Sequence, residues 1–218
     1  MTRDLGPYII FCSTREYCKN RAILFAANTP DTRKPVTEIF EEIRDAVNGR
    51  SLTPLAQDLG RCLSKSVGFH HSGLDSRIKK LVEDKFLNEE IKFIFATTGL
   101  AYGINLPARS VVLFDMKMYD PLRNVSSYIP VYLYQQMAGR AGRPQFDIDG
   151  YSFIVTRNKK DEMAAHEKYF KGILKRAFSH IAEDAYFRKA ILELIYSNRG
   201  RPEEILTFFQ KNILPLSI

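Results

Sequence analysis

The sequence predicts an α/β fold in which helices flank a parallel β-sheet and a small, mostly α-helical segment follows. Two observations predict it. Up to Thr156, short apolar runs alternate with amphipathic helical patterns, which is typical of βαβ units. After Thr156, helical patterns follow one another with no convincing strand pattern between them. We therefore expect a sheet domain over residues 1–157 and a helical segment over residues 158–218.

The strands are expected where short, continuous apolar runs are bounded by Gly, Pro or polar residues. Runs of this length are too short for buried helices, and continuous apolar runs suit a sheet that is covered on both faces. In chain order, the expected strands are Tyr8–Cys12, Val67–His70, Ile91–Ala96, Ser110–Phe114 and Tyr151–Val155.

The helices are expected where apolar residues recur at helical spacing behind a capping residue. Ser13 or Thr14, Thr53 and Asp75 each stand where a side chain can accept a hydrogen bond from the first turn, and Pro54 suits a first helical turn. In chain order, the expected helices cover residues 15–27, 36–48, 53–64, 75–87, 131–137, 161–171, 183–197 and 202–210.

The composition is that of a soluble globular protein, with 45% hydrophobic and 26% charged residues. No apolar run approaches the roughly 18 residues that cross a bilayer, and Met1–Pro7 lacks a signal-peptide core, so no membrane association is expected. Cys12, Cys18 and Cys62 form no CxxC pair and are expected to be buried, reduced thiols of a cytoplasmic protein, nucleoid-associated in a prokaryote. The net charge of +7 favours a polyanionic partner.

The strongest functional pattern is Gln135–Pro144, in which Arg140 and Arg143 are separated only by small residues. Glycines beside an arginine let a ligand approach the backbone closely. A guanidinium group on such a turn suits a phosphoryl group that gains charge during transfer. Without context the same pattern is more often a basic surface turn, so its interpretation depends on the motifs upstream.

Three further motifs directly follow expected strands, at residues 13–15, 69–74 and 96–107. Ligand-contacting loops of a parallel sheet lie at the carboxyl ends of its strands. Small residues, hydroxyl groups and a helix N-terminus there can donate hydrogen bonds to phosphate oxygens. The adjacent His70 and His71 could also suggest a metal, but no third ligand stands at a typical spacing, so no metal site is expected.

The four motifs in this order resemble the C-terminal, second RecA-like motor domain of superfamily-two helicases, over residues 7–156. The AxGINLP, HHSGL and QMAGRAGRP forms are together similar to the subgroup of archaeal DNA-repair and RNA-exosome-associated helicases. The helical insertion at residues 36–64 suits that subgroup, whereas DEAD-box proteins usually carry His-Arg where this chain has Gln136-Met137. Residues 166–218 resemble the start of the winged-helix domain that follows the motor, and we expect that domain to be incomplete.

The resemblance implies a role for each candidate residue at the nucleotide. Arg140 and Arg143 would be arginine fingers, and Gln136 would contact the nucleotide or couple the two sites. Gly103 and Asn105 would lie at the interdomain ATP cleft. The implied cofactors are ATP and Mg²⁺, both held mainly by the N-terminal motor domain of the same protein.

The resemblance also implies contacts to the phosphate backbone of a nucleic acid. A Ser or Thr cap and a buried His have plain structural explanations as well, so both interpretations stay open for several of these residues. The implied nucleic-acid-binding residues are Ser13, Thr14, Arg15, His71, Gly73, Thr97 and Thr98.

The sequence lacks a phosphate-binding loop of the Walker A type, because no glycine is followed by lysine. Asp161-Glu162 matches the DExx pattern of the acidic motif that such motors need at a strand end. It follows polar residues and not an apolar strand, so we interpret it as a solvated helix start. We therefore expect the C-terminal half of an ATP-dependent helicase that grips single-stranded or forked nucleic acid, DNA favoured over RNA, and that hydrolyses no ATP alone. The alternatives are a non-catalytic nucleic-acid-binding or scaffold module, an RNA helicase of the exosome-associated type, and a nuclease or topoisomerase subunit.

Overall fold

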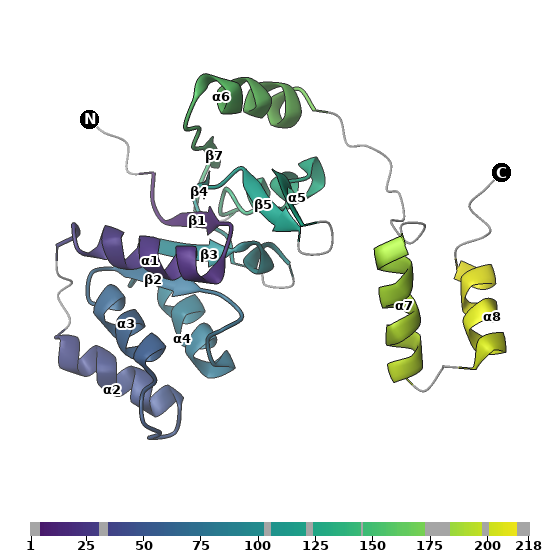
Figure 1. Cartoon of the computed structure of the whole chain (residues 1–218). Helices are drawn as coiled ribbons and strands as arrows, with labels where there is room; N and C mark the ends of the chain where they lie inside the picture. The colour runs from purple at the N-terminus through teal and green to yellow at the C-terminus, as the bar shows by residue number, and fades with distance from the viewer. Residues whose placement is uncertain are drawn as a thin grey trace. The chain divides into compact units, whose positions relative to one another are not determined.

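The computed structural model describes residues 5–30, 35–102, 106–120, 124–144, 146–172, 184–197 and 201–212 (Figure 1). The chain divides into two compact units. The first comprises Met1–Tyr119 with Ser126–Leu174, and the second comprises Asp120–Val125 with Lys175–Ile218. None of the helices within the described ranges is both long and apolar enough to span a membrane.

The first unit is built on a five-stranded sheet with the strand order β2-β3-β1-β4-β7, in which every neighbouring pair is parallel. This confirms the predicted fold class. The central strand, β1, is almost wholly buried, as its continuous apolar sequence indicates. The strands are β1 Tyr8–Cys12, β2 Val67–His70, β3 Phe93–Thr97, β4 Ser110–Leu113 and β7 Tyr151–Ile154.

The helices of the first unit begin where the sequence places capping residues. Thr14, Thr53 and Asp75 each accept a hydrogen bond from a backbone N–H in the first turn of the helix that follows. The predicted helices therefore form, with ends that differ by a few residues. They are α1 Arg15–Ala26, α2 Val36–Ala46, α3 Pro54–Leu63, α4 Ser76–Leu87 and α5 Val131–Ala138.

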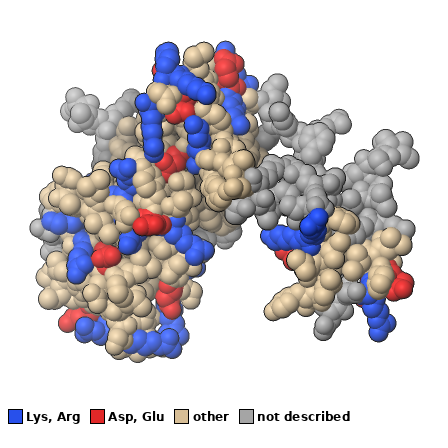
Figure 2. Space-filling view, viewed as in Figure 1, with Lys and Arg blue, Asp and Glu red and all other residues tan. Residues whose placement is uncertain are grey.

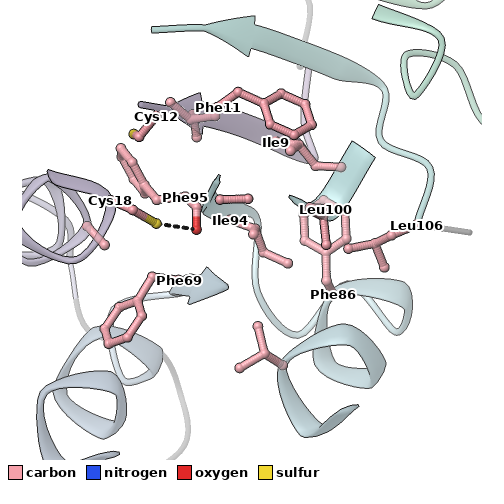
Figure 3. Packing of buried hydrophobic residues seen from close by; sticks show 14 of the residues in the cluster. Ile9, Phe11, Cys12, Cys18, Phe69, Phe86, Ile94, Phe95, Leu100 and Leu106 are labelled. Carbon is pink, nitrogen blue, oxygen red and sulfur yellow. Dashed lines mark hydrogen bonds between the residues drawn. The ribbon is translucent and has the colours of Figure 1, made fainter. Parts of the chain in front are cut away.

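Buried side chains fill the space on both sides of the sheet (Figure 3). On one side, Phe25 of α1 packs its ring against Phe93 and Phe95 of β3. The Cys18 thiol on the same helix donates a hydrogen bond of 3.0 Å to the Phe95 carbonyl oxygen. All three cysteines are buried and free, as predicted. On the other side, Figure 3 groups Ile9 and Ile94 with Phe86, Leu100 and Leu106.

Three local features differ from the sequence expectation. A two-stranded sheet of β5 Lys117–Asp120 and β6 Val125–Tyr128 was not predicted, because both strands are partly exposed and carry no apolar run. A short 3₁₀ turn, η1 Thr98–Ala101, follows β3. The expected single helix at residues 161–171 is α6 Lys159–Ala165, which continues as the π-helical η2 His166–Phe170.

The predicted helix start at Asp161-Glu162 is confirmed, since both lie in the first turn of α6, but the prediction that Asp161 is solvated is wrong. Its carboxylate is buried, with 9% of the residue exposed, and it accepts a hydrogen bond of 2.9 Å from the Tyr128 hydroxyl. That contact joins α6 to β6, a strand that the sequence did not reveal. Glu162, the next residue, is exposed as expected.

The second unit contains two of the predicted helices, α7 Asp184–Tyr196 and α8 Pro202–Asn212. Glu203 and Glu204 stand in the first turn of α8, where they favour the helix dipole. Several large apolar side chains of this unit are exposed, namely Leu192, Ile195, Tyr196 and Leu206. The winged-helix identity of this segment stays a prediction.

Candidate functional site

The sheet topology collects the seven candidate nucleic-acid-binding residues at one edge. β2, β3 and β1 are adjacent and parallel, so the segments that follow them leave the sheet at the same, carboxyl edge. These segments carry all seven residues, which are Ser13, Thr14, Arg15, His71, Gly73, Thr97 and Thr98.

Ser13 is fixed at this edge by Asp115, which follows β4. The Asp115 carboxylate accepts hydrogen bonds from the Ser13 backbone N–H at 3.0 Å and from its hydroxyl at 3.1 Å. The same carboxylate accepts a bond of 2.9 Å from Arg157, which lies beyond β7. Neither Asp115 nor Arg157 was recognised from sequence, although each stands just after a predicted strand. The Ser13 hydroxyl thus donates inside the protein.

Thr14 and Arg15 form the exposed start of α1. The Thr14 hydroxyl oxygen accepts the Tyr17 N–H at 3.1 Å, so Thr14 is a helix cap whose own proton can still be donated. Arg15 is exposed and has no carboxylate partner among the described residues. The edge therefore offers a hydroxyl donor and a cation side by side at a helix N-terminus.

His71 is buried, with only 4% of the residue exposed, and its ring stacks on Phe69. Its Nδ1 accepts the Gly73 N–H at 3.1 Å. Burial lowers the pKa of His71, and the nearby positive charge of Arg15 lowers it further. The ring is therefore neutral with its proton on Nε2, and this buried N–H has no hydrogen-bond partner within the described part of the chain.

Gly73 and His70 complete the surroundings of His71. A Cβ added at Gly73 would meet the His71 ring at 3.0 Å, so a side chain there would displace the imidazole. His70 bonds through Nε2 to Glu83 at 2.8 Å and so has a partner of its own. Among the described residues, no group of three or more His, Cys, Asp or Glu side chains is arranged to hold a metal ion.

Thr97 and Thr98 are half-buried at the end of β3 and the start of η1. No hydrogen bond to the described residues involves either hydroxyl, so both can donate to a ligand. Ala101 closes the same 3₁₀ turn and accepts a hydrogen bond of 2.8 Å from the Arg140 guanidinium. Arg140 thus links its own turn to the segment that carries the two threonines.

The turn that carries Arg140 and Arg143 follows α5 and lies against the amino end of β4. The Arg140 carbonyl accepts the Ala108 N–H at 2.9 Å, and the Gly142 N–H donates to the Ala108 carbonyl at 2.7 Å. Gly142 has a φ of +92°, a conformation that favours glycine. A Cβ at Gly150, just before β7, would lie 2.5 Å from the turn's backbone, so these glycines allow the turn to pack closely.

Arg143 is held on three sides. Its Nε and Nη2 donate to the two oxygens of Asp147 at 2.8 and 3.1 Å. Its Nη1 pairs with Glu89, in the turn after α4, and its guanidinium lies 5.3 Å from the Phe146 ring centroid. The hydrogen bonds with Asp147 raise the pKa of Arg143 above its usual range and lower the pKa of Asp147, so both stay charged.

A pocket of about 660 Å³ adjoins Arg143. It is lined by Pro7, residues 86–89, Pro107, Pro144 and Phe146.

The other residues predicted to contact the nucleotide are Gln136, Gly103 and Asn105. Gln136 is an exposed side chain on the last turn of α5 and makes no hydrogen bond with the described residues. Gly103 and Asn105 lie outside the described residues. Arg143 is thus separate from the nucleic-acid candidates, because Ser13 to Thr98 occupy the carboxyl edge of the sheet whereas Arg143 pairs with Glu89 beside its amino edge. Arg140, by contrast, contacts the 3₁₀ turn that begins at Thr98.

A parallel sheet with these motifs at its strand ends defines the C-terminal domain class of helicases. Residues 2–145 match the family described as helicase conserved C-terminal domain, and the chain belongs to this family. The resemblance to superfamily-two helicases is thereby confirmed.

The relatives are named as archaeal DNA helicases. The chain is 36% identical over 176 residues to the ATP-dependent DNA helicase Hel308 of Pyrobaculum calidifontis, covering 81% of the chain and 24% of the relative. It is 30% identical over 205 residues to Hel308 of Methanocella arvoryzae, covering 94% and 28%. For Hel308 of Pyrococcus horikoshii the identity is 33% over 173 residues, covering 79% and 24%. The chain thus spans about a quarter of the length of these relatives.

Proposed function

We propose that this chain is the C-terminal motor half of an ATP-dependent DNA helicase. Arg140 and Arg143 would reach the γ-phosphate of ATP bound by an N-terminal motor domain of the same protein. The carboxyl edge of the sheet would hold one nucleic-acid strand. The observation that carries this proposal is the separation of Arg143 from the residues of the carboxyl edge, since a motor must bind nucleotide and strand at once and couple them.

The carboxyl edge suits phosphate oxygens. Among the described residues, the Thr97 and Thr98 hydroxyls have no hydrogen-bond partner and Arg15 has no carboxylate partner, so all three can meet a ligand, and His71 offers a buried Nε2–H. Charge-assisted and hydroxyl bonds of this kind position a backbone but read no bases. Binding should therefore show little sequence preference. The face of the molecule in Figure 2 carries both Lys and Arg and Asp and Glu side chains.

The contact of Arg140 with Ala101 suggests how the two sites could be coupled. Ala101 belongs to η1, whose first residue is Thr98, and η1 packs against α5, the helix that precedes Arg140. A shift of Arg140 toward a nucleotide would break its bond to the Ala101 carbonyl and so affect the threonine segment. The exposed Gln136 amide would add a contact to the nucleotide.

Arg140 and Arg143 are suited to contact a nucleotide that another domain binds. Arginines that stabilise charge on a transferred phosphoryl group are commonly supplied by a domain other than the one that binds the phosphates. Magnesium, where bound, neutralises charge on the phosphates, and it would be held by the N-terminal domain with the ATP. We also propose the division into a motor domain at residues 1–157 and the start of a winged helix at residues 158–218, with a cytoplasmic location.

DNA is proposed as the substrate because the relatives are named DNA helicases. The test is ATP hydrolysis by the full-length protein that carries this chain, with single-stranded DNA, RNA or neither. Arg143→Ala should lower the stimulated rate by about 10³-fold or more, as expected of an arginine finger. Arg44→Ala, at an exposed arginine of α2, is the matched control. Stronger stimulation by RNA would favour the exosome-associated type, and normal turnover by Arg143→Ala would favour a binding module.

A further inference from the structure

The contacts of Arg143 are unequal on the two edges of its guanidinium. Nε and Nη2 form a two-point pair with Asp147, whose side chain is only 3% exposed. Nη1, on the outer edge, meets Glu89, whose side chain is 58% exposed. The first contact is buried and geometrically matched, whereas the second is a single contact that solvent can reach.

Asp147 is itself fixed to the arginine turn. Its Oδ2 also accepts the Arg143 backbone N–H at 3.2 Å, and its own backbone N–H donates to the Arg143 carbonyl at 2.9 Å. Arg109 lies 3.8 Å from its other oxygen. The carboxylate therefore cannot move away without breaking several bonds, and it fixes the plane in which the Arg143 guanidinium lies.

Glu89 is placed by the backbone rather than by packing. It occupies the turn after α4 with a φ of 58°, and its N–H donates to the Phe86 carbonyl at 3.1 Å. Its carboxylate places one anionic oxygen, Oε1, against Nη1, the same chemistry that a phosphate oxygen would present. A carboxylate and a phosphate cannot occupy one guanidinium edge together.

We propose that Asp147 is a positioning residue that turns the Nη1 edge of Arg143 outward, and that Glu89 occupies this edge until the γ-phosphate of ATP replaces it. This inference rests on the proposed function, since it takes Arg143 as an arginine finger. While no ATP is bound, Glu89 would lower the affinity of Arg143 for phosphate. Asp147 would keep the Arg143 guanidinium in the same orientation while the γ-phosphate replaces Glu89.

The exchange at Glu89 is tested by ATP hydrolysis of the full-length protein with saturating single-stranded DNA. Glu89→Gln removes the charge at an exposed position, so the fold is retained. Because an exposed ion pair is weak, kcat/KM for ATP should rise by about two- to five-fold. Glu41→Gln, which makes the same charge change at an exposed position of α2, should leave kcat/KM unchanged. An unchanged or lowered kcat/KM in Glu89→Gln would overturn the exchange.

The positioning role is tested with Asp147→Asn, which keeps the shape but loses the charge. We expect kcat to fall by about tenfold or more while KM for ATP changes by less than about twofold, as for an interaction needed in the transition state. The same substitution is then made on Arg143→Lys. Because lysine cannot form the two-point pair, Asp147→Asn should lower kcat little further there. An equal fall in both backgrounds would show a merely structural role.

The outcomes separate this inference from the proposed function. If Arg143→Ala hydrolyses ATP normally, the arginine-finger proposal itself fails. If Arg143→Ala loses activity while Glu89→Gln and Asp147→Asn both behave as the unmodified protein, only the inference fails. Circular dichroism of each variant checks folding, and Asp147→Glu, which keeps the charge and displaces the two oxygens, replaces Asp147→Asn if the latter unfolds.

Discussion

Ser13 and Asp115 lie 102 residues apart in the chain and are joined by two hydrogen bonds at the carboxyl edge of the sheet. The bonds tie the segment after β1 to the segment after β4, on neighbouring strands. Arg157, beyond β7, binds the other oxygen of the same carboxylate. Asp115 therefore fixes the relative positions of three strand ends where we propose that a nucleic-acid strand binds.

Replacing Asp115 with Ala should destabilise the first unit. The part-buried Ser13 N–H would lose its acceptor, and an unsatisfied buried donor costs about 1–3 kcal/mol, whereas the exposed Arg157 guanidinium would turn to water. Urea unfolding followed by circular dichroism measures the change. Asp45→Ala, at an exposed position of α2, should stay within about 0.5 kcal/mol of the unmodified chain. Equal stabilities of the two variants would show that the Asp115 bonds do not matter.

Binding of the chain to single-stranded DNA should be weak and should fall steeply with salt. Contacts to phosphates release counterions, so the logarithm of the binding constant falls linearly with the logarithm of salt concentration. Arg15→Ala should reduce that slope by roughly one, since it removes one cation. Fluorescence anisotropy with a labelled oligonucleotide, at several salt concentrations, measures the slope for the unmodified chain and for Arg15→Ala. Binding that is indifferent to salt would contradict the phosphate-contact model.

The sequence revealed the sheet because most of its strands are largely buried and so form continuous apolar runs, as in Tyr8–Cys12. It did not reveal β5 and β6, which are partly exposed and polar. Arg140 and Arg143 were recognised from local spacing and resemblance. Asp115 and Asp147 were missed because their roles come from contacts made only after folding. The separation of Arg143 from the carboxyl edge likewise depends on the topology of the whole sheet.

The buried cysteines should resist modification while the chain is folded. Burial raises the pKa of Cys18 and of Cys62 to about 12, and it raises the pKa of Cys12 as well, so almost no thiolate exists near neutral pH. With a chromogenic disulfide reagent at pH 8, the folded chain should react far more slowly than the chain in denaturant. Fast reaction of all three thiols under native conditions would contradict this burial.

Stability should fall as the pH drops below about 6.5, the ordinary pKa of histidine. Burial lowers the pKa of His70 and of His71 in the folded chain. Between that lowered pKa and about 6.5 the unfolded state binds more protons than the folded state, so the free energy of unfolding rises with pH there and falls on acidification.

Urea unfolding from pH 7.5 to 5 measures this dependence of the free energy of unfolding on pH. His71→Gln should reduce it, whereas His166→Gln, at an exposed ring, should not. Equal slopes in the two variants would show that His71 takes up its proton in the folded chain as readily as in the unfolded one.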